Sequence, residues 1–477
     1  MIKFLSILIA LLLLISSCAE NNSKKNKPNI LFIFADDLSY EAVHFAGNNE
    51  VITPNLDKLA NAGVTFTHSY NMGGWNGAVC IASRAMLNTG RFLWRARSAQ
   101  SNYPEMKDKD QFWSLLLEKA GYETYMTGKW HVAVPADSLF QHARDIRPGM
   151  PASVPEAYNR PLSKMDTTWL PWHRKYGGYW QGGKHWSEVV GDNAIDFLDM
   201  AQNSEKPFFM YLAFNAPHDP RQSPKEFVNM YPLEDIAIPE NFQELYPYKD
   251  SIGCGENLRD ERLAPFPRTE YSIKVHRQEY YAIITHMDEQ IGRIIAHLKE
   301  TGQDKNTYIL FSADHGLSVG HHGLVGKQNM FDHSMRVPLI VAGPDIPKNE
   351  KREMQVYLQD IMATTLELTG IEKPEYVKFN SLIPLITQDK TDSFYSEIYG
   401  AYIDFQRMVR TDKFKLVVYP KARKMLLFDL ENDPLEMNDL SDDPNFQATK
   451  MQLISRLKAQ QEKMYDPLDL HLYFEVF

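Results

Sequence analysis

NILFIFADD, residues 29–37, is an apolar run without polar alternation that ends in two aspartates. Strands of this kind are buried on both faces, as in the parallel sheets of α/β proteins. Four more runs share this character: YETYMTGKWH (122–131), FFMYLAFNAPHDP (208–220), TYILFSADHG (307–316) and VPLIVAGP (337–344). We predict that all five are buried parallel strands.

Helical patterns lie between these runs. TPNLDKLANAG, residues 53–63, places Thr53 as N-cap, Pro54 at the first helical position and Gly63 as a stop. Residues 279–302 carry an apolar stripe at helical spacing, made of Tyr280, Ile284, Met287, Ile291, Ile294 and Leu298. Alternating strands and helices predict a doubly wound α/β sheet.

The character of the chain changes after about residue 385. Four short runs there predict antiparallel strands, FYSEIYG (394–400), FQRMVRT (405–411), FKLVVYP (414–420) and KMLLFDL (424–430), and a helix follows over 448–464. We therefore expect a main α/β domain over residues 28–385 and a small α+β domain, built on an antiparallel sheet, over 386–477.

The first 27 residues read as a targeting segment. Lys3 precedes an apolar run over residues 4–15, which is too short to cross a bilayer comfortably, and Ser16 and Ser17 precede Cys18. This order resembles a bacterial lipoprotein signal over residues 1–17, in which Cys18 becomes the lipidated first residue. A polar tether follows over 18–27. We expect export and lipid anchoring to a bacterial membrane, in the periplasm or at the cell surface; an ordinary signal peptide is the alternative.

Composition narrows the class of partner. The 477 residues are 44% hydrophobic and 23% charged, as in a globular protein, and the net charge of −10 argues against nucleic acid. Only three cysteines are present, so with Cys18 lipidated at most one disulfide, Cys80 to Cys254, is possible.

Reactive side chains follow four of the five predicted strands. These are Asp36 and Asp37, Lys129 with His131, His218, and Asp314 with His315. Ligands of parallel sheets bind beyond the carboxyl ends of the strands, so we expect these side chains to meet. Adjacent carboxylates repel each other unless a cation lies between them, and an oxygen-rich set favours Ca²⁺ or Mg²⁺ over zinc. A turn or helix cap would explain Asp36 and Asp37 taken alone.

Cationic and proton-transferring groups accompany the acidic ones. Taken together with a metal, Arg84, Lys129, His131, His218 and Lys327 suit an anionic tetrahedral substrate such as sulfate or phosphate. Each of them alone could be an ordinary surface or turn residue.

NGAVCIASRAMLNTGR, residues 76–91, places Cys80 four residues before Arg84 and ends in Thr-Gly-Arg. It resembles the signature of the type I sulfatases, Cys-x-Pro/Ala-x-Arg followed by Thr-Gly-Arg. The strand-end motifs, residues 53–70 and LLFDLENDPLEMNDL (426–440) also resemble sulfatase blocks, in family order and across nearly the whole mature chain. The resemblance implies the alkaline-phosphatase-like α/β sandwich with a small C-terminal sheet domain.

The resemblance also implies a cofactor and its partners. In that family the cysteine is oxidised to formylglycine by a formylglycine-generating or anaerobic maturation enzyme, and the hydrated aldehyde supplies a nucleophilic hydroxyl. Carried over to this chain, Ca²⁺ would be held by Asp36, Asp37, Asp314, His315 and the modified Cys80. Two positions depart from the common pattern. Ala82 stands where Pro is commoner, and His315 stands where many members have Asn, which resembles the iduronate-sulfatase-like branch.

The resemblance assigns a role to each remaining residue. Arg84 would orient the formylglycine, and Lys129 and His131 would contact its hydroxyls, with His131 as base for sulfate release. His218 would protonate the leaving alkoxide, and Lys327 would hold the sulfate oxygens.

The stretch 167–190 is rich in aromatic, glycine and basic residues. Sugar rings pack on aromatic rings, so we predict that Trp180, His185 and Arg174 bind a sulfated saccharide that is cut from its non-reducing end. The alternative is that these aromatics bury a long connection against the body.

We therefore predict a carbohydrate sulfatase. A phosphate or phosphonate monoester hydrolase of the same superfamily is the second reading, although such enzymes usually need more positive charge or two metals. An inactive glycan-binding surface protein is the third, and it would predict gaps in the set of site residues.

Overall fold

The computed structural model describes residues 27–388, 390 and 392–476. Cys18 and the predicted signal and tether, except residue 27, lie outside this range. Within it, no helix combines the length and apolar character that a membrane crossing requires. Cys80 and Cys254 are both buried, and neither forms a disulfide in the part of the chain that is described.

An eight-stranded sheet forms the centre of the molecule, in the order β5-β4-β6-β1-β7-β8-β2-β9. Its strands are β1 (Asn29–Ala35), β2 (Gly63–Tyr70), β4 (Glu123–Lys129), β5 (His142–Arg147), β6 (Phe208–Ala213), β7 (Thr307–Ala313), β8 (Arg336–Ala342) and β9 (Glu350–Tyr357). In the middle, Ile33 of β1 pairs with Leu212 of β6 and Phe311 of β7. Residues 30–35 are fully buried, as the apolar run predicts.

Strand β8 runs opposite to its neighbours, and the prediction of a parallel strand at 337–344 is wrong. It pairs antiparallel with both β7 and β2. A parallel neighbour needs a crossover that carries the chain back along the sheet. Residues 314–335 make no such return and stay at the edge where β7 ends, so β8 begins where β7 stopped. The other four predicted strands are parallel to one another.

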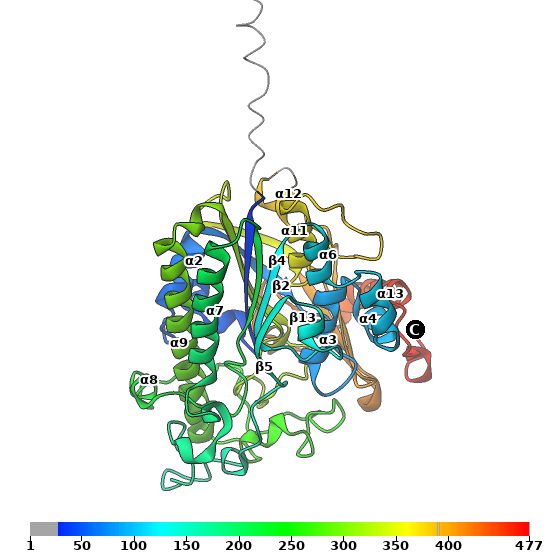
Figure 1. The fold of residues 1–477 in the computed structure, drawn as a ribbon. Coiled ribbons are helices and arrows are strands. Elements are labelled where there is room, and N and C mark those ends of the chain that lie inside the picture. Colours follow the sequence, from blue (N-terminus) through cyan, green and yellow to red (C-terminus); the bar gives the residue numbers. More distant parts are fainter. Residues whose placement is uncertain (1–26, 389, 391, 477) are drawn as a thin grey trace, which may run out of the picture.

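Helices cover both faces of this sheet (Figure 1). Helices α2 (Pro54–Asn61), α7 (Trp186–Gln202), α8 (Lys225–Asn229) and α9 (Glu270–Glu300) lie on one side; α3 (Val79–Thr89), α6 (Trp113–Lys119), α11 (Asp360–Leu368) and α12 (Ile383–Ile386) lie on the other. Short helices α4 (Leu93–Ala99), α5 (Tyr103–Asp108) and α10 (Asp332–Met335) complete the set. All six residues of the predicted stripe on α9 are buried, so that prediction is confirmed.

A second sheet has the order β13-β12-β11-β10-β3. Strands β10 (Ile398–Tyr402), β11 (Gln406–Arg410), β12 (Phe414–Tyr419) and β13 (Lys424–Asp429) are antiparallel, as predicted, and helix α13 (Gln447–Met464) contacts β11 and β12. The remaining strand, β3 (Gly73–Gly74), comes from the N-terminal part and pairs parallel with β10. Gly73 has φ of 81°, and a Cβ there would lie 2.1 Å from the Ala401 carbonyl oxygen. The domain boundary at 385/386 stays a prediction.

Candidate active site

The residues predicted at the strand ends meet at one edge of the large sheet. Asp36 and Asp37 follow β1, Lys129 ends β4 and Asp314 follows β7. All four are buried. The backbone N–H of Asp37 donates to Asp314 Oδ1 at 3.2 Å, so the two neighbouring strand ends are joined directly.

Helix α3 brings Cys80 and Arg84 to this edge. The residues are four apart, which places both on one face of the helix. Cys80 Sγ lies 3.2 Å from His131 Nδ1. Arg84 is fully buried and donates from Nε to Asp314 Oδ2 at 2.9 Å and from Nη1 to the Lys129 carbonyl at 2.8 Å. Arg84 therefore ties the helix to two strand ends.

Two buried lysines and a histidine neutralise the acidic side chains. Lys129 Nζ contacts Asp36 Oδ2. Lys327, from the loop between β7 and β8, donates to Asp37 Oδ1 at 2.7 Å and Oδ2 at 2.6 Å. His218 Nε2 lies 3.6 Å from Asp37 Oδ2. One cluster therefore contains the side chains that the sequence marked as reactive, at positions 36–37, 129–131, 218, 314–315 and 327.

Burial and mutual charge shift the pKa values of these groups. Burial and the neighbouring Asp314 carboxylate raise the pKa of Asp36 to about 7. Burial acts to raise the pKa of Asp314, but the Arg84 guanidinium, together with Lys129, Lys327 and a hydrogen bond with Asp36, outweighs it and holds that pKa below its usual range. Burial, with Lys129 and Arg84, lowers the pKa of His131 to about 2, so this imidazole is neutral with a free lone pair.

The donor atoms fit a hard divalent cation. Oxygen or sulfur atoms of Asp36, Cys80 and Asp314 lie within 4.8 Å of one another. Asp36 Oδ1 and His315 Nε2 are buried without a hydrogen-bond partner among the described residues. His315 Nδ1 donates to the Gly316 carbonyl at 3.1 Å, which leaves a lone pair on Nε2. The carboxylate oxygens of this set are ligands that suit Ca²⁺ or Mg²⁺, whereas the imidazole nitrogen is a softer donor.

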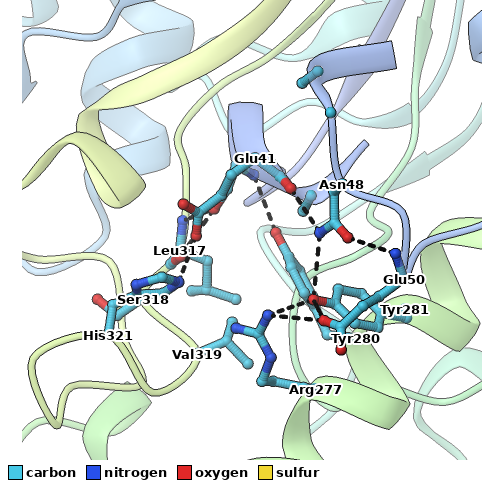
Figure 2. Close-up of a pocket in the computed structure, with 14 residues that line it drawn as sticks. Glu41, Asn48, Glu50, Arg277, Tyr280, Tyr281, Leu317, Ser318, Val319 and His321 are labelled. Carbon is cyan, nitrogen blue, oxygen red and sulfur yellow. Dashed lines mark hydrogen bonds and ion pairs between the residues drawn. The ribbon is translucent and has the colours of Figure 1, made fainter. Parts of the chain in front are cut away.

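A cavity of about 350 Å³ lies behind the loop at residues 37–39 (Figure 2). On its wall, the Tyr280 hydroxyl donates to the Asp37 carbonyl at 2.7 Å and accepts from the Ser39 N–H at 3.1 Å. Charged groups around it pair with one another: Glu41 with His321 at 2.6 Å and Glu50 with Arg277 at 3.4 Å. Tyr280, on the wall of this cavity, therefore holds the loop that carries Asp37.

Three residues near His218 were missed by the sequence analysis. Asp219 Oδ1 lies 3.1 Å from His218 Nδ1, and Tyr158 donates to Asp219 Oδ2 at 2.8 Å. Arg259 Nη2 lies 3.5 Å from Asp219 Oδ1. The adjacency of Asp219 to His218 was a usable signal. Tyr158 and Arg259 come from irregular segments, where no periodicity marks them.

The structure contradicts His185 and Trp180 as saccharide contacts. His185 is fully buried and caps α7: its Nδ1 accepts from the Ser187 N–H at 3.1 Å and its Nε2 donates to the Gln222 carbonyl at 2.9 Å. Trp180 is 5% exposed, and its Nε1 donates to the Pro171 carbonyl at 3.2 Å. These rings bury the connection against the body, which was the alternative reading. Arg174 is exposed and lies over the Trp180 ring, and its role stays a prediction.

Comparison with known proteins gives matches along most of the chain. A family model described as sulfatase matches residues 28–371, and one described as N-sulphoglucosamine sulphohydrolase, C-terminal, matches residues 320–463. The choline-sulfatase of Rhizobium meliloti is 29% identical over 448 residues, which cover 88% of this chain and 83% of the relative. The N-acetylglucosamine-6-O-sulfatase of Bacteroides thetaiotaomicron is 24% identical over 532 residues, which cover 95% of this chain and 89% of the relative.

Solved structures share the fold. A protein in complex with its substrate D-glucosamine-2-N,6-O-disulfate has a TM-score of 0.72 at 22% identity, covering 93% of this chain and 99% of that one. A phosphonate monoester hydrolase from Silicibacter pomeroyi has a TM-score of 0.71 at 21% identity, and the match covers 92% of this chain and 96% of that one. At these identities the likeness concerns the fold alone.

Proposed function

The chain belongs to the sulfatase family and is a sulfuric ester hydrolase, and from that premise we propose that it removes sulfate from the non-reducing end of a carbohydrate. The proposal includes a formylglycine made from Cys80 and a bound Ca²⁺. It is carried by one observation: buried carboxylates, lysines and histidines from five segments meet around Cys80 and Arg84.

The metal would be held by Asp36, Asp37, Asp314 and His315, together with the modified residue 80. Asp36 Oδ1 and His315 Nε2, for which no residue of the described ranges serves as a hydrogen-bond partner, support this assignment. When bound, Ca²⁺ supplies positive charge against the sulfate oxygens. Lys327 would donate to those oxygens and Lys129 to the hydroxyls of residue 80; both side chains are buried and held in place by carboxylates.

Residue 80 would carry the nucleophile, since a hydrated formylglycine offers a hydroxyl there in place of a thiol. His131 is placed to take a proton from residue 80, because its Nδ1 lies 3.2 Å from the Cys80 sulfur and its low pKa leaves it neutral. Arg84 fixes the position of α3 through Asp314 and the Lys129 carbonyl.

His218 would be the acid for the leaving group. As the sulfur–oxygen bond to the sugar breaks, the electron pair stays on the sugar oxygen and His218 Nε2 gives it a proton. Asp219 supports this role, because its carboxylate oxygen Oδ1 lies 3.1 Å from Nδ1, the other ring nitrogen, and so helps to orient the ring.

The activities for which the relatives are named support a sulfate ester as substrate and leave the alcohol part of that ester open. One relative is a choline-sulfatase and another acts on N-acetylglucosamine 6-O-sulfate. We favour a sugar because a cavity of about 700 Å³, large enough for a saccharide, is lined by Tyr158 and Arg259, and both side chains contact Asp219 next to His218. The phosphonate monoester hydrolase shares the fold, so phosphonate and phosphate esters belong in the assay as competitors.

The test is a substrate comparison on enzyme co-expressed with a maturation enzyme, with Cys80→Ala as control. Sulfated monosaccharides, sulfated oligosaccharides, 4-nitrophenyl sulfate, choline sulfate and phenyl phosphonate are compared by kcat/KM. We expect saccharides with a terminal sulfated residue to be preferred over internally sulfated chains. A strong preference for choline sulfate, the aryl sulfate or the phosphonate would refute the proposal.

A further inference from the structure

Two arginines line the cavity whose wall residues Tyr158 and Arg259 contact Asp219, the neighbour of His218. Its wall includes Tyr158, Asn159, Glu256, Arg259, Arg262 and Phe266, which come from two irregular segments far apart in the chain. Its volume is about 700 Å³. Of the described residues that line it, Glu256 alone is acidic.

Arg259 connects this cavity to both histidines of the proposed reaction. On one side its Nη2 lies 3.5 Å from Asp219, whose carboxylate contacts His218. On the other side its Nη1 contacts the Met150 sulfur. Met150 follows Gly149, where a Cβ would lie 2.2 Å from His131 Cε1. The arginine therefore lies between the segment that carries the proposed acid and the segment at 149–150, whose Gly149 packs against the ring of the proposed base.

Both guanidinium groups have donors to spare. Asp260 fixes Arg259 through an Nε bond of 2.8 Å, while the Nη1 group faces only a thioether sulfur, a weak acceptor. Arg262 is exposed, and its side chain makes no hydrogen bond or ion pair with any residue of the described ranges. The chain as a whole has a net charge of −10, so this pair of arginines is a local concentration of positive side chains near the site.

We infer that Arg259 and Arg262 bind a second anionic group on the saccharide, a sulfate or a carboxylate, while its terminal sulfate is cleaved. This rests on the proposed function and narrows its substrate class to sugars with at least two negative charges. Guanidinium groups pair with such oxyanions through paired N–H donors, which gives both affinity and orientation. The ring of Tyr158 adds an aromatic surface to this wall, against which a sugar can pack.

Two matched pairs of probes test the inference. N-acetylglucosamine 6-sulfate, which is neutral at its 2-position, is compared with glucosamine-2-N,6-O-disulfate, and a 6-sulfated, uronate-containing disaccharide is compared with its carboxyl-reduced form. The first pair isolates a second sulfate and the second pair a carboxylate. We measure kcat/KM on the mature enzyme and binding by calorimetry on the full-length Cys80→Ala variant, so probes that are not turned over also give a result.

We expect the doubly charged member of at least one pair to be preferred by about 10-fold or more, mainly through KM, as for charge-assisted hydrogen bonds. In Arg262→Gln this ratio should fall to within about 3-fold of unity. Arg97→Gln is the matched control: it removes the same charge from an exposed arginine on α4 that does not line the cavity.

The outcomes separate the two proposals. If the saccharides bind and react but the ratio is near unity in the wild type, or equal in the wild type and Arg262→Gln, the inference is wrong and the proposed function stands. If no saccharide binds or reacts while 4-nitrophenyl sulfate is hydrolysed, the saccharide proposal fails and the inference falls with it.

Discussion

Asp288 of α9 provides the N-terminal cap of α2, and its removal should destabilise the enzyme measurably. Its Oδ1 accepts from the Leu56 N–H at 2.7 Å, and its Oδ2 accepts from the Asn55 N–H at 3.1 Å and the Asn55 side-chain amide at 2.9 Å. Thr53, the residue at the N-cap position, makes no capping bond and instead accepts from the His44 N–H at 3.0 Å.

The size of the expected loss in the free energy of unfolding follows from these contacts. Asp288→Ala leaves the donors of Leu56 and Asn55 without their acceptor, at about 1–3 kcal/mol for a buried donor and about 0.5–2 kcal/mol for a lost cap. Removing a buried carboxylate recovers part of its desolvation cost. We expect a net loss of about 2–4 kcal/mol in the free energy of unfolding.

The loss should depend on pH. Burial raises the pKa of Asp288 to about 6 from its usual value near 4. The native state therefore holds an extra proton between those values, so the wild type loses stability as pH rises through this window. Because the variant lacks the group, its deficit relative to wild type should be larger at pH 5 than at pH 7.5.

Hydrogen exchange of a peptide that spans α2 is the sharpest assay, with urea denaturation for the whole molecule. A local loss of about 3 kcal/mol corresponds to roughly 100-fold faster exchange, at about 1.4 kcal/mol per factor of ten. Asp57→Ala is the matched control. It removes an aspartate of α2 itself, whose partner His44 lies 2.7 Å away and is exposed. We therefore expect the free energy of unfolding to fall by less than about 1 kcal/mol. Equal exchange in the two variants would refute the capping argument.

Four further predictions concern the site and the anchor. In active enzyme, peptide mass analysis should show formylglycine at Cys80, and Cys80→Ala should lower kcat by about 10³-fold or more; full activity with an unmodified thiol would refute the mechanism. Asp314→Ala and chelation should each remove the metal, measured by elemental analysis, together with activity, and an unchanged rate after chelation would contradict the metal assignment. Tyr280→Phe should lower kcat/KM by about 10-fold through loss of the hydroxyl that holds the loop at 37–39, with the fold retained by circular dichroism; an unchanged kcat/KM would show that the loop does not need it. Cys18→Ala should release the protein from the membrane fraction of its native host, and a wild type found freely soluble there would disprove the anchor.

The sequence predicted the centre of the site well because strand ends are strong signals. Apolar runs that stop at Asp36, Lys129, His218 and Asp314 can only place those residues at one edge of a parallel sheet. The direction of β8 was not predictable in this way, because an apolar run reads the same in either direction. Its orientation depends on the path of residues 314–335.

The surroundings of individual side chains were the second thing that the sequence could not predict. Thr53 occupies the expected N-cap position, but the capping acceptor comes from Asp288, more than 230 residues later in the chain. His185 and Trp180 have the composition of a sugar-binding loop, yet burial turns them into supports for α7 and its approach. The arginines at 259 and 262 lie in a segment without periodicity, so only the folded chain shows what they face.

The pairing of β3 with β10 sets an order of events during synthesis. The strand partner of Gly73 and Gly74 is made about 330 residues later, a delay of roughly 15–65 s at ordinary elongation rates. Until then, the segment that leads into Cys80 has one edge without backbone partners. In the finished molecule the Cys80 thiol is 2% exposed. The proposed conversion of Cys80 to formylglycine would therefore have to precede the arrival of the C-terminal sheet.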